Sequence, residues 1–227
     1  AVGFKRQLPD TRRRAHLVLQ GDAALFRGDK HGRLGRVAEH RPAVPFVLRP
    51  KRYPEQRVTL KDQRKVTPNA EDEARIAKEQ ALMAPAWKAW PEALVPALSF
   101  RQPTPGDLTA SFGMRRIFNG VPRSPHSGLD IRAPQGQAVR APAPGRVVLT
   151  GDFFYSGQAV FIAHGEGAVS LLCHLSKISV KEGQLLQAGD LVGEVGRTGR
   201  ATGPHLHWSL SLNNARVDPR IFLGGHP

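Results

Sequence analysis

Two histidines with one residue between them, His205 and His207, stand near the C-terminal end of the sequence. The residues that follow, as far as Leu212, alternate in polarity as the residues of a strand do. Side chains two apart on a strand point to the same face, so we expect both imidazoles to project together. Far upstream, His126 and Asp130 lie four residues apart in a glycine-containing turn. Two histidines and one carboxylate form a catalytic zinc set that leaves one position to water, although a lone His-x-His is also typical of hydrogen-bonded strand histidines.

A third histidine, His174, follows the single cysteine, Cys173, in an apolar run. A cysteine beside a histidine invites interpretation as a nucleophile and its base. Adjacent residues on a strand face opposite sides, so we expect Cys173 to point into the core while His174 faces the site. A buried, unreactive thiol is therefore the expected state of Cys173. One cysteine also excludes an internal disulfide.

Motifs around these residues follow one another in a fixed order between Ala110 and Leu223. They are Ser111–Arg115 (SFGMR), Pro125–Asp130 (PHSGLD), Ala141–Gly145 (APAPG), Cys173–Ile178 (CHLSKI) and Thr202–Trp208 (TGPHLHW). The ordered set resembles the lysostaphin-like (LytM-type) zinc metalloendopeptidases, which cut peptide bonds in bacterial cell walls. The segment 149–157 and the region before the motifs resemble the Gram-negative periplasmic branch of that family, which carries an N-terminal accessory domain.

The resemblance implies one zinc ion per chain, with His126, Asp130 and His207 as its ligands. It implies that His174 and His205 are catalytic histidines that do not bind the metal. Zinc lowers the pKa of a bound water to roughly 7. A histidine, with an ordinary pKa of about 6.5, suits the movement of protons near neutrality. No His-Glu-x-x-His helix is present, so local spacing supplies no glutamate base.

Two further polar residues need separate interpretations. Asn119 lies in the loop ahead of the first ligand, where it could hydrogen-bond substrate. His164 matches a recurrent family position, but Ala163 stands before it where relatives often carry Asp. We expect His164 to be a hydrogen-bonded histidine at the end of the sheet, outside the mechanism.

Composition indicates a folded, basic chain. Of its 227 residues 40% are hydrophobic, which is enough for a core, and the net charge is +14. Such a surface attracts polyanions, but runs such as Arg12–Arg14 are more typical of solvated faces, and no nucleic-acid motif accompanies them. No apolar run is long enough to span a membrane. The resemblance implies a periplasmic or secreted protein, with a signal peptide or anchor removed before Ala1.

Residues 1–66 read as short strands separated by turns, and we expect a small β-rich accessory domain there. The next region, 67–105, is expected to be a helix followed by a Pro-rich connector that forms the domain boundary. Thr67 or Asn69 would cap the helix, which should end before Pro85. Trp87 and Trp90 would lie in the connector; packing onto a domain is favoured over binding sugar rings.

Residues 106–227 are expected to form an all-β catalytic domain, mainly one antiparallel sheet, with no helix of ordinary length. The expected strands are 137–140, 145–150, 158–164, 168–174, 191–195 and 206–212. Expected turns lie at 151–152, 165–167 and 188–190.

The functional expectation is a zinc-dependent endopeptidase that acts on peptidoglycan stem peptides, chiefly on D-alanyl–diaminopimelate cross-links. Three alternatives stay open: a non-enzymatic activator of other wall hydrolases, a basic binding module, and a glycyl-glycine endopeptidase. The N-terminal domain is expected either to restrict the groove or to serve as a spacer or wall-binding module, and a regulatory protein is a further expected partner.

Overall fold

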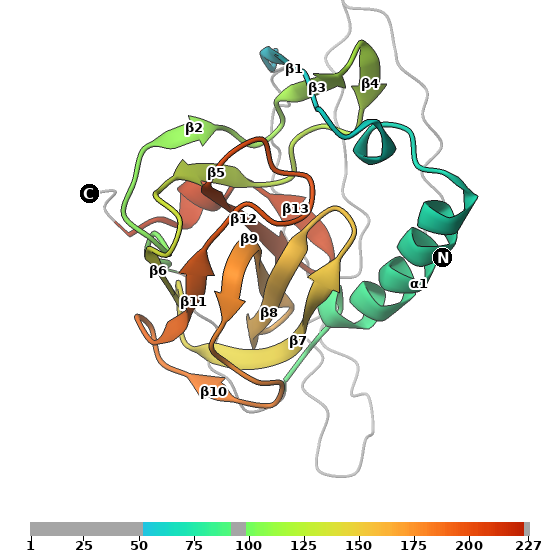
Figure 1. The fold of residues 1–227 in the computed structure, drawn as a ribbon. Helices are drawn as coiled ribbons and strands as arrows, with labels where there is room; N and C mark the ends of the chain where they lie inside the picture. The colour runs from blue at the N-terminus through green and yellow to red at the C-terminus, as the bar shows by residue number, and fades with distance from the viewer. Residues whose placement is uncertain (1–51, 92–98, 225–227) are drawn as a thin grey trace, which may run out of the picture. The chain divides into compact units, whose positions relative to one another are not determined.

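The computed structural model describes residues 52–91 and 99–224, and the description concerns those residues (Figure 1). Residues from Tyr53 onward belong to one compact unit of the chain. The strands expected between residues 15 and 48 lie outside the described residues. The small N-terminal β domain and its boundary therefore stay predictions.

A ten-stranded sheet makes up most of the described chain. Its central path runs β10 (Leu185–Leu186), β7 (Gly145–Phe153), β8 (Gly157–Gly165), β9 (Ala168–Ile178), β12 (His205–Leu212), β5 (Leu129–Arg132) and β2 (Leu108–Ala110). Off this path, β11 (Leu191–Val195) pairs with β9 and with β6 (Ala138–Arg140), and β13 (Ala215–Val217) pairs with β12. All these pairings are antiparallel, which confirms the expected all-β catalytic domain.

The six strands expected within residues 106–227 are all present, most with both ends within one or two residues of the expected ones; β7 and β9 run three and four residues further. The turns expected at 165–167 and 188–190 are also observed. The turn expected at 151–152 is wrong, because β7 continues to Phe153 and the chain turns at 154–156 instead. Gly151 pairs with Ala159 across the ladder, so backbone pairing overrides the turn preference of a Gly-Asp pair.

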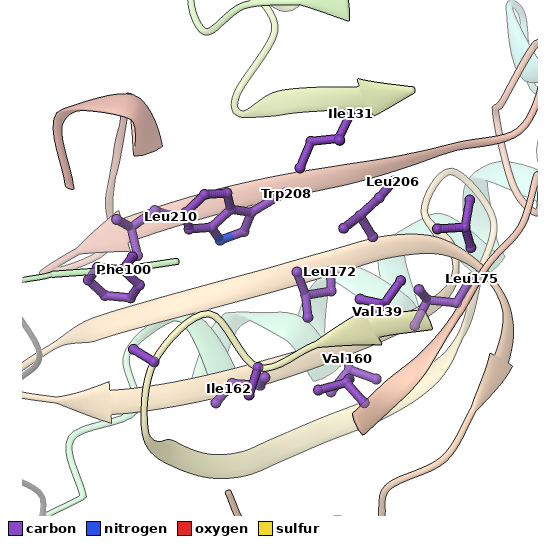
Figure 2. Close-up of a cluster of buried hydrophobic side chains, with 14 of the residues drawn as sticks. Phe100, Ile131, Val139, Val160, Ile162, Leu172, Leu175, Leu206, Trp208 and Leu210 are labelled. Carbon is purple, nitrogen blue, oxygen red and sulfur yellow. The ribbon is translucent and has the colours of Figure 1, made fainter. Parts of the chain in front are cut away.

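One face of the large sheet carries the main hydrophobic core (Figure 2). Leu206, Trp208 and Leu210 alternate along β12 and are completely buried. Leu172 of β9 pairs in register with Trp208 and packs in the same cluster. The indole Nε1 of Trp208 donates to Ser170 Oγ at 3.1 Å, which satisfies its polar group inside the core. The core therefore fixes β12 so that its intervening residues face the other way.

Helix α1 (Ala70–Trp87) packs over a second, smaller hydrophobic cluster on β7 and β8. It begins at Asn69, whose side chain accepts from the Asp72 amide in a capping box. The expectation that the helix ends before Pro85 is wrong, since the helix runs two residues further. Ala86 is buried and Trp87 is half-buried, with its ring edge-on to Phe161 at 4.8 Å, and this tertiary packing extends the helix. The expectation that Trp87 lies in the connector is therefore wrong, since it is the last residue of α1, but its packing onto the domain is as favoured from the sequence.

A three-stranded sheet joins β1 (Glu55–Val58) to the hairpin of β3 (Arg115–Phe118) and β4 (Val121–Arg123). Its β1 lies parallel to β3 at the sheet edge, within the region 1–66 where short strands were expected. Short 3-10 helices follow β1 (Gln63–Lys65) and end the described chain (Pro219–Phe222). Segments before and after the predicted connector therefore share one sheet.

Candidate metal centre and catalytic histidines

Three neighbouring strands place one residue each in a row across the face opposite the main core. Asp130 on β5 pairs in register with His207 on β12, and His207 pairs with Cys173 on β9. Residues paired across antiparallel strands point to the same face and lie close together. The buried Leu and Trp side chains of β12 fix the register of this row. A shift of the pairing by one residue would turn His207 into the core and the apolar side chains out of it.

His126 joins this row from the loop that leads into β5. Its Nδ1 donates to the Ser111 carbonyl at 3.0 Å, which leaves the lone pair of Nε2 free. That Nε2 lies 3.0 Å from Asp130 Oδ1 and 2.9 Å from His207 Nδ1. His207 Nδ1 is itself 2.8 Å from the same carboxylate oxygen. One atom from each of three residues therefore converges on one point.

These three atoms fit a bound cation. The other ring nitrogen of His207, Nε2, lies 2.8 Å from Ser209 Oγ. When the ring proton is on Nε2, the lone pair of Nδ1 is free to bind a cation. Two imidazole lone pairs and a carboxylate oxygen then face one another, with all ligand atoms of the three side chains within 4.8 Å. Such an arrangement repels itself unless a positive ion lies between the atoms. Two nitrogens and one oxygen are a donor set typical of catalytic zinc, which keeps one open position.

The protonation states of the ligands suit metal binding. Burial lowers the pKa of His207 to about 4, so its imidazole is neutral at pH 7. Burial alone would raise the pKa of Asp130, but hydrogen bonds and charge from His126 and His207 reverse the direction and hold it below its ordinary value. The carboxylate therefore stays ionised, and neither Asp130 nor His207 has to lose a proton near neutral pH.

The two remaining expected histidines lie beside this cluster, each with one nitrogen held by a carbonyl. His205 Nδ1 donates to Gly203 O at 2.8 Å, and its Nε2 lies 3.9 Å from Asp130 Oδ1. His174 Nδ1 donates to Thr198 O at 2.8 Å. The two rings lie 4.8 Å apart, with Nε2 of each unclaimed by a protein hydrogen bond among the described residues. Burial lowers the pKa of His174 to about 3, so it is a neutral imidazole.

Cys173 is buried in the smaller hydrophobic cluster, as expected, but the expectation that it faces the side opposite His174 is wrong. Cys173 pairs in register with His207 and so faces the site side. His174 has a φ of +62°, and the β8–β9 register shifts between Gln158 and Val160. An irregularity of this kind re-aims a side chain and breaks the alternation, so both residues line one cavity. The thiol is buried and its pKa is raised to about 12 by burial, which agrees with the unreactive cysteine expected.

A cavity of about 250 Å³ opens beside the histidines. His174 and His207 line it together with residues that sequence reasoning did not place at the site. These are Met83 and Trp87 of α1, Tyr155, and the arginines Arg116, Arg200 and Arg216. The four-residue spacing of Met83 and Trp87 placed them on one helix face. Nothing in the sequence indicated that this face borders the site.

Arg116 of β3 contacts the predicted metal ligand directly. Its Nη2 lies 3.3 Å from Asp130 Oδ2, the oxygen that does not face the two histidines. The guanidinium is largely buried, and burial lowers its pKa despite the neighbouring carboxylate. Arg116 therefore orients the carboxylate and adds positive charge at the cavity wall.

Asn119 does not join this group of side chains. It occupies the turn between β3 and β4, where its Oδ1 accepts from Leu60 N at 2.8 Å. Its Nδ2 donates to Leu60 O and to Gln63 Oε1 at 3.0 and 2.9 Å. These hydrogen bonds use both polar atoms of the Asn119 side chain to hold the β3–β4 turn against the segment 60–63, which is a structural role.

His164 is a hydrogen-bonded histidine near the end of β8, as expected, and its ring lies against Phe100 of the main core. Its Nδ1 donates to Pro144 O at 2.7 Å, its Nε2 is 2.9 Å from Ser170 Oγ, and burial lowers its pKa to about 4.

Comparison with known proteins supports this arrangement. Residues 124–219, which contain every histidine and carboxylate of the cluster, match the profile described as peptidase family M23. The DD-carboxypeptidase/endopeptidase Mpg of Neisseria meningitidis serogroup B is 45% identical over 94 residues, which are 41% of this chain and 22% of Mpg. The peptidoglycan DD-endopeptidase ShyA of Vibrio cholerae is 39% identical over 112 residues, which are 49% of this chain and 26% of ShyA. The chain thus spans about a quarter of these relatives' length.

A solved structure shares the fold. The crystal structure of a Pseudomonas aeruginosa protein assigned to peptidase M23 is 46% identical, with a TM-score of 0.62. The similarity covers 69% of this chain and 64% of that protein. The match therefore includes most of the region from Tyr53 onward that the structure describes.

Proposed function

The chain belongs to peptidase family M23, and from this membership and the site we propose that it is a zinc-dependent endopeptidase that hydrolyses stem-peptide amide bonds of peptidoglycan. The convergence of His126 Nε2, Asp130 Oδ1 and His207 Nδ1 carries this proposal. A non-enzymatic relative would not need a cluster with all three ligand side chains and two further histidines beside it.

The side chains divide the work of hydrolysis. When bound, zinc would supply a Lewis acid and lower the pKa of water to roughly 7. His205 and His174 are held by carbonyls through Nδ1, so each offers Nε2 to the reacting groups. One of them takes a proton from the attacking water, and a proton is then given to the leaving amine. Because the pKa of His174 is about 3, it serves as an acceptor or orienting group in the resting state.

The bond we propose is the D-alanyl–diaminopimelate cross-link. The relatives named above are described as a DD-carboxypeptidase/endopeptidase and a DD-endopeptidase, which supports a bond between two D-centres. The net charge of +14 favours approach to a wall polymer with exposed carboxylates. That steering is screened over roughly 10 Å at ordinary ionic strength, so it contributes to encounter and not to choice of bond.

The proposed place of action is outside the cytoplasm, in the periplasm or as a secreted protein, because peptidoglycan is there. No helix among the described residues is long and apolar enough to cross a membrane. A regulatory protein partner and a restricting role for the N-terminal region stay predictions.

Mass spectrometry of purified muropeptides tests the proposal. Cross-linked dimers and pentaglycine are incubated with the zinc-loaded chain, with and without a chelator. Conversion of dimers to monomers that the chelator blocks is the expected result. Cleavage of pentaglycine with intact dimers would instead indicate a glycyl-glycine endopeptidase. Stoichiometric zinc without cleavage of either would favour an activator, and absence of zinc would favour a binding module.

A further inference from the structure

Arg200 stands in the loop between β11 and β12, five residues before the catalytic His205. Its backbone amide donates to Tyr155 O at 2.8 Å, which ties the loop to the β7–β8 turn. Its guanidinium carbon lies 4.4 Å from the Tyr155 ring centroid and 4.8 Å from that of Phe118. Contacts with two aromatic rings hold the planar group in place, and the side chain lines the cavity beside His174 and His207.

The guanidinium of Arg200 has no counter-ion in the described part of the chain. No ion pair and no side-chain hydrogen bond is formed by it there, although Arg116 is paired with Asp130 and Arg216 donates to Ser211 Oγ at 3.0 Å. Burial, followed by the charge of Arg116, lowers the pKa of Arg200 to about 10. Removing an arginine from water without a partner is costly, so this position suits a group that arrives with a negative charge.

The other charges at the cavity favour an anion as well. Arg116 and Arg216 line the same walls, and Arg216 lies over the face of Trp87. No acidic residue is among the described residues that line this cavity. Asp130, beside the cavity, already has Arg116 and the histidines as partners. Asp62 lines a separate cavity that Arg200 also borders, and its Oδ1 accepts from Arg64 N. Carboxylates match the planar fork of a guanidinium and bind it through two parallel hydrogen bonds.

The proposed substrate carries such a group next to the bond that is cut. In a D-alanyl–diaminopimelate cross-link, the carbon attached to the scissile nitrogen also bears a free carboxylate. The same holds for a terminal D-alanyl–D-alanine, whereas an internal glycyl-glycine bond has an amide there. A carboxylate-binding group beside the metal centre would therefore separate these substrate classes.

We propose that Arg200 binds the carboxylate on the leaving-amine side of the scissile bond and so determines specificity for bonds of this kind. The inference rests on the proposed endopeptidase function and names the feature of the substrate that the site recognises. A charge-assisted guanidinium–carboxylate contact contributes a preference on the order of ten- to a hundredfold.

A matched pair of substrates tests this assignment. Cross-linked dimers are prepared with the diaminopimelate carboxyl beside the scissile nitrogen either free or amidated, and kcat/KM is measured with the zinc-loaded full chain. The wild type is expected to prefer the free acid by about ten- to a hundredfold. Arg200→Gln should cleave both dimers with the kcat/KM that the wild type shows for the amidated one, and its zinc content should be unchanged. Arg200→Lys keeps the charge but not the fork, so its preference should be intermediate.

Arg197 provides the control, since it is an exposed arginine of the same loop that does not line this cavity. Arg197→Gln removes the same charge and should retain the wild-type preference. Binding is measured in parallel with ketomethylene analogues of both dimers, which cannot be cleaved. Equal affinity of the wild type for acid and amide, or a preference that survives in Arg200→Gln, overturns the proposal. Analogue preference without cleavage of either dimer would contradict the endopeptidase function and leave the Arg200 assignment supported.

Discussion

The histidines of the site differ in which ring nitrogen is hydrogen-bonded by the protein and in where the other nitrogen lies. His126 is held through Nδ1 by Ser111 O, and His207 has Ser209 Oγ at Nε2. The free nitrogens of these two rings therefore meet at 2.9 Å beside Asp130. His205 and His174 also use Nδ1 for carbonyls, but their Nε2 atoms do not enter the three-atom cluster.

This difference predicts opposite results for two neighbouring variants. His207→Ala removes a ligand atom and is expected to lose both zinc and activity. His205→Ala should keep close to one zinc per chain and lose turnover on the order of a hundredfold or more, because a positioned acid–base group is missing. Metal analysis of both purified variants, together with the rate of dimer cleavage, checks the assignment. Loss of zinc in His205→Ala with retention in His207→Ala would reverse it.

His164 predicts how stability depends on pH. Its folded-state pKa of about 4 lies below the ordinary 6.5 because burial disfavours the charged ring. Between these values the unfolded chain binds a proton that the folded chain does not, so stability falls as pH drops through this window. The contribution is at most about 1.4 kcal/mol per pH unit, and buried His174 and His207 act in the same direction.

Urea denaturation of the chelated protein at several pH values from 7 to 4.5 measures this slope. His164→Gln should lower stability at pH 7, because it disturbs the contacts with Pro144 O and Ser170, and should also make the pH slope shallower. An unchanged slope in this variant would show that His164 does not titrate in the window.

At the scale of elements, α1 joins the catalytic sheet through few large side chains. Trp87 contacts Phe161 edge-on, and Arg216 lies 3.2 Å from the centroid of its ring. The same tryptophan lines the cavity with His174. The helix therefore links the packing of the sheet to the shape of the site.

Trp87→Ala is expected to destabilise the protein by about 2 kcal/mol or more, somewhat less than the 3–5 kcal/mol of a fully buried ring. Activity should fall as well, because one wall of the cavity is lost. Trp90→Ala is the control: its side chain is 56% exposed, and surface changes of this kind stay within about 0.5 kcal/mol. Denaturant unfolding of both variants measures the difference, and equal losses would contradict the packing role.

At the scale of the whole molecule, the described elements bear on how the N-terminal region can be tested. Strand β1 and helix α1 both pack with the catalytic part. A chain shortened to about residue 96 would therefore lose a cavity wall as well as the proposed accessory domain. Removal of residues 1–52 leaves these elements in place.

The chain 53–227 is thus the sharper test of restriction. If residues 1–52 restrict the groove, this chain should digest soluble muropeptides faster than the full-length chain, at equal zinc content. Equal rates would leave only a spacer or wall-binding role for these residues. A thermal unfolding measurement on both chains shows whether the shortened one stays folded.

The sequence by itself determined the family, the strand pattern and the five histidine and carboxylate positions of the site. These are local properties: His205 and His207 alternate on a strand, and motif order is read along the chain. The boundaries of most strands followed for the same reason, because alternation and glycine turns are encoded by neighbouring residues.

Tertiary structure alone decided which further residues meet at the site. The break in alternation at His174, the extension of α1 past Pro85 and the gathering of Arg116, Arg200 and Arg216 each depend on contacts between distant segments. A register shift, a buried ring or a shared cavity is set by the free energy of packing these segments together, and no periodicity within one segment records it.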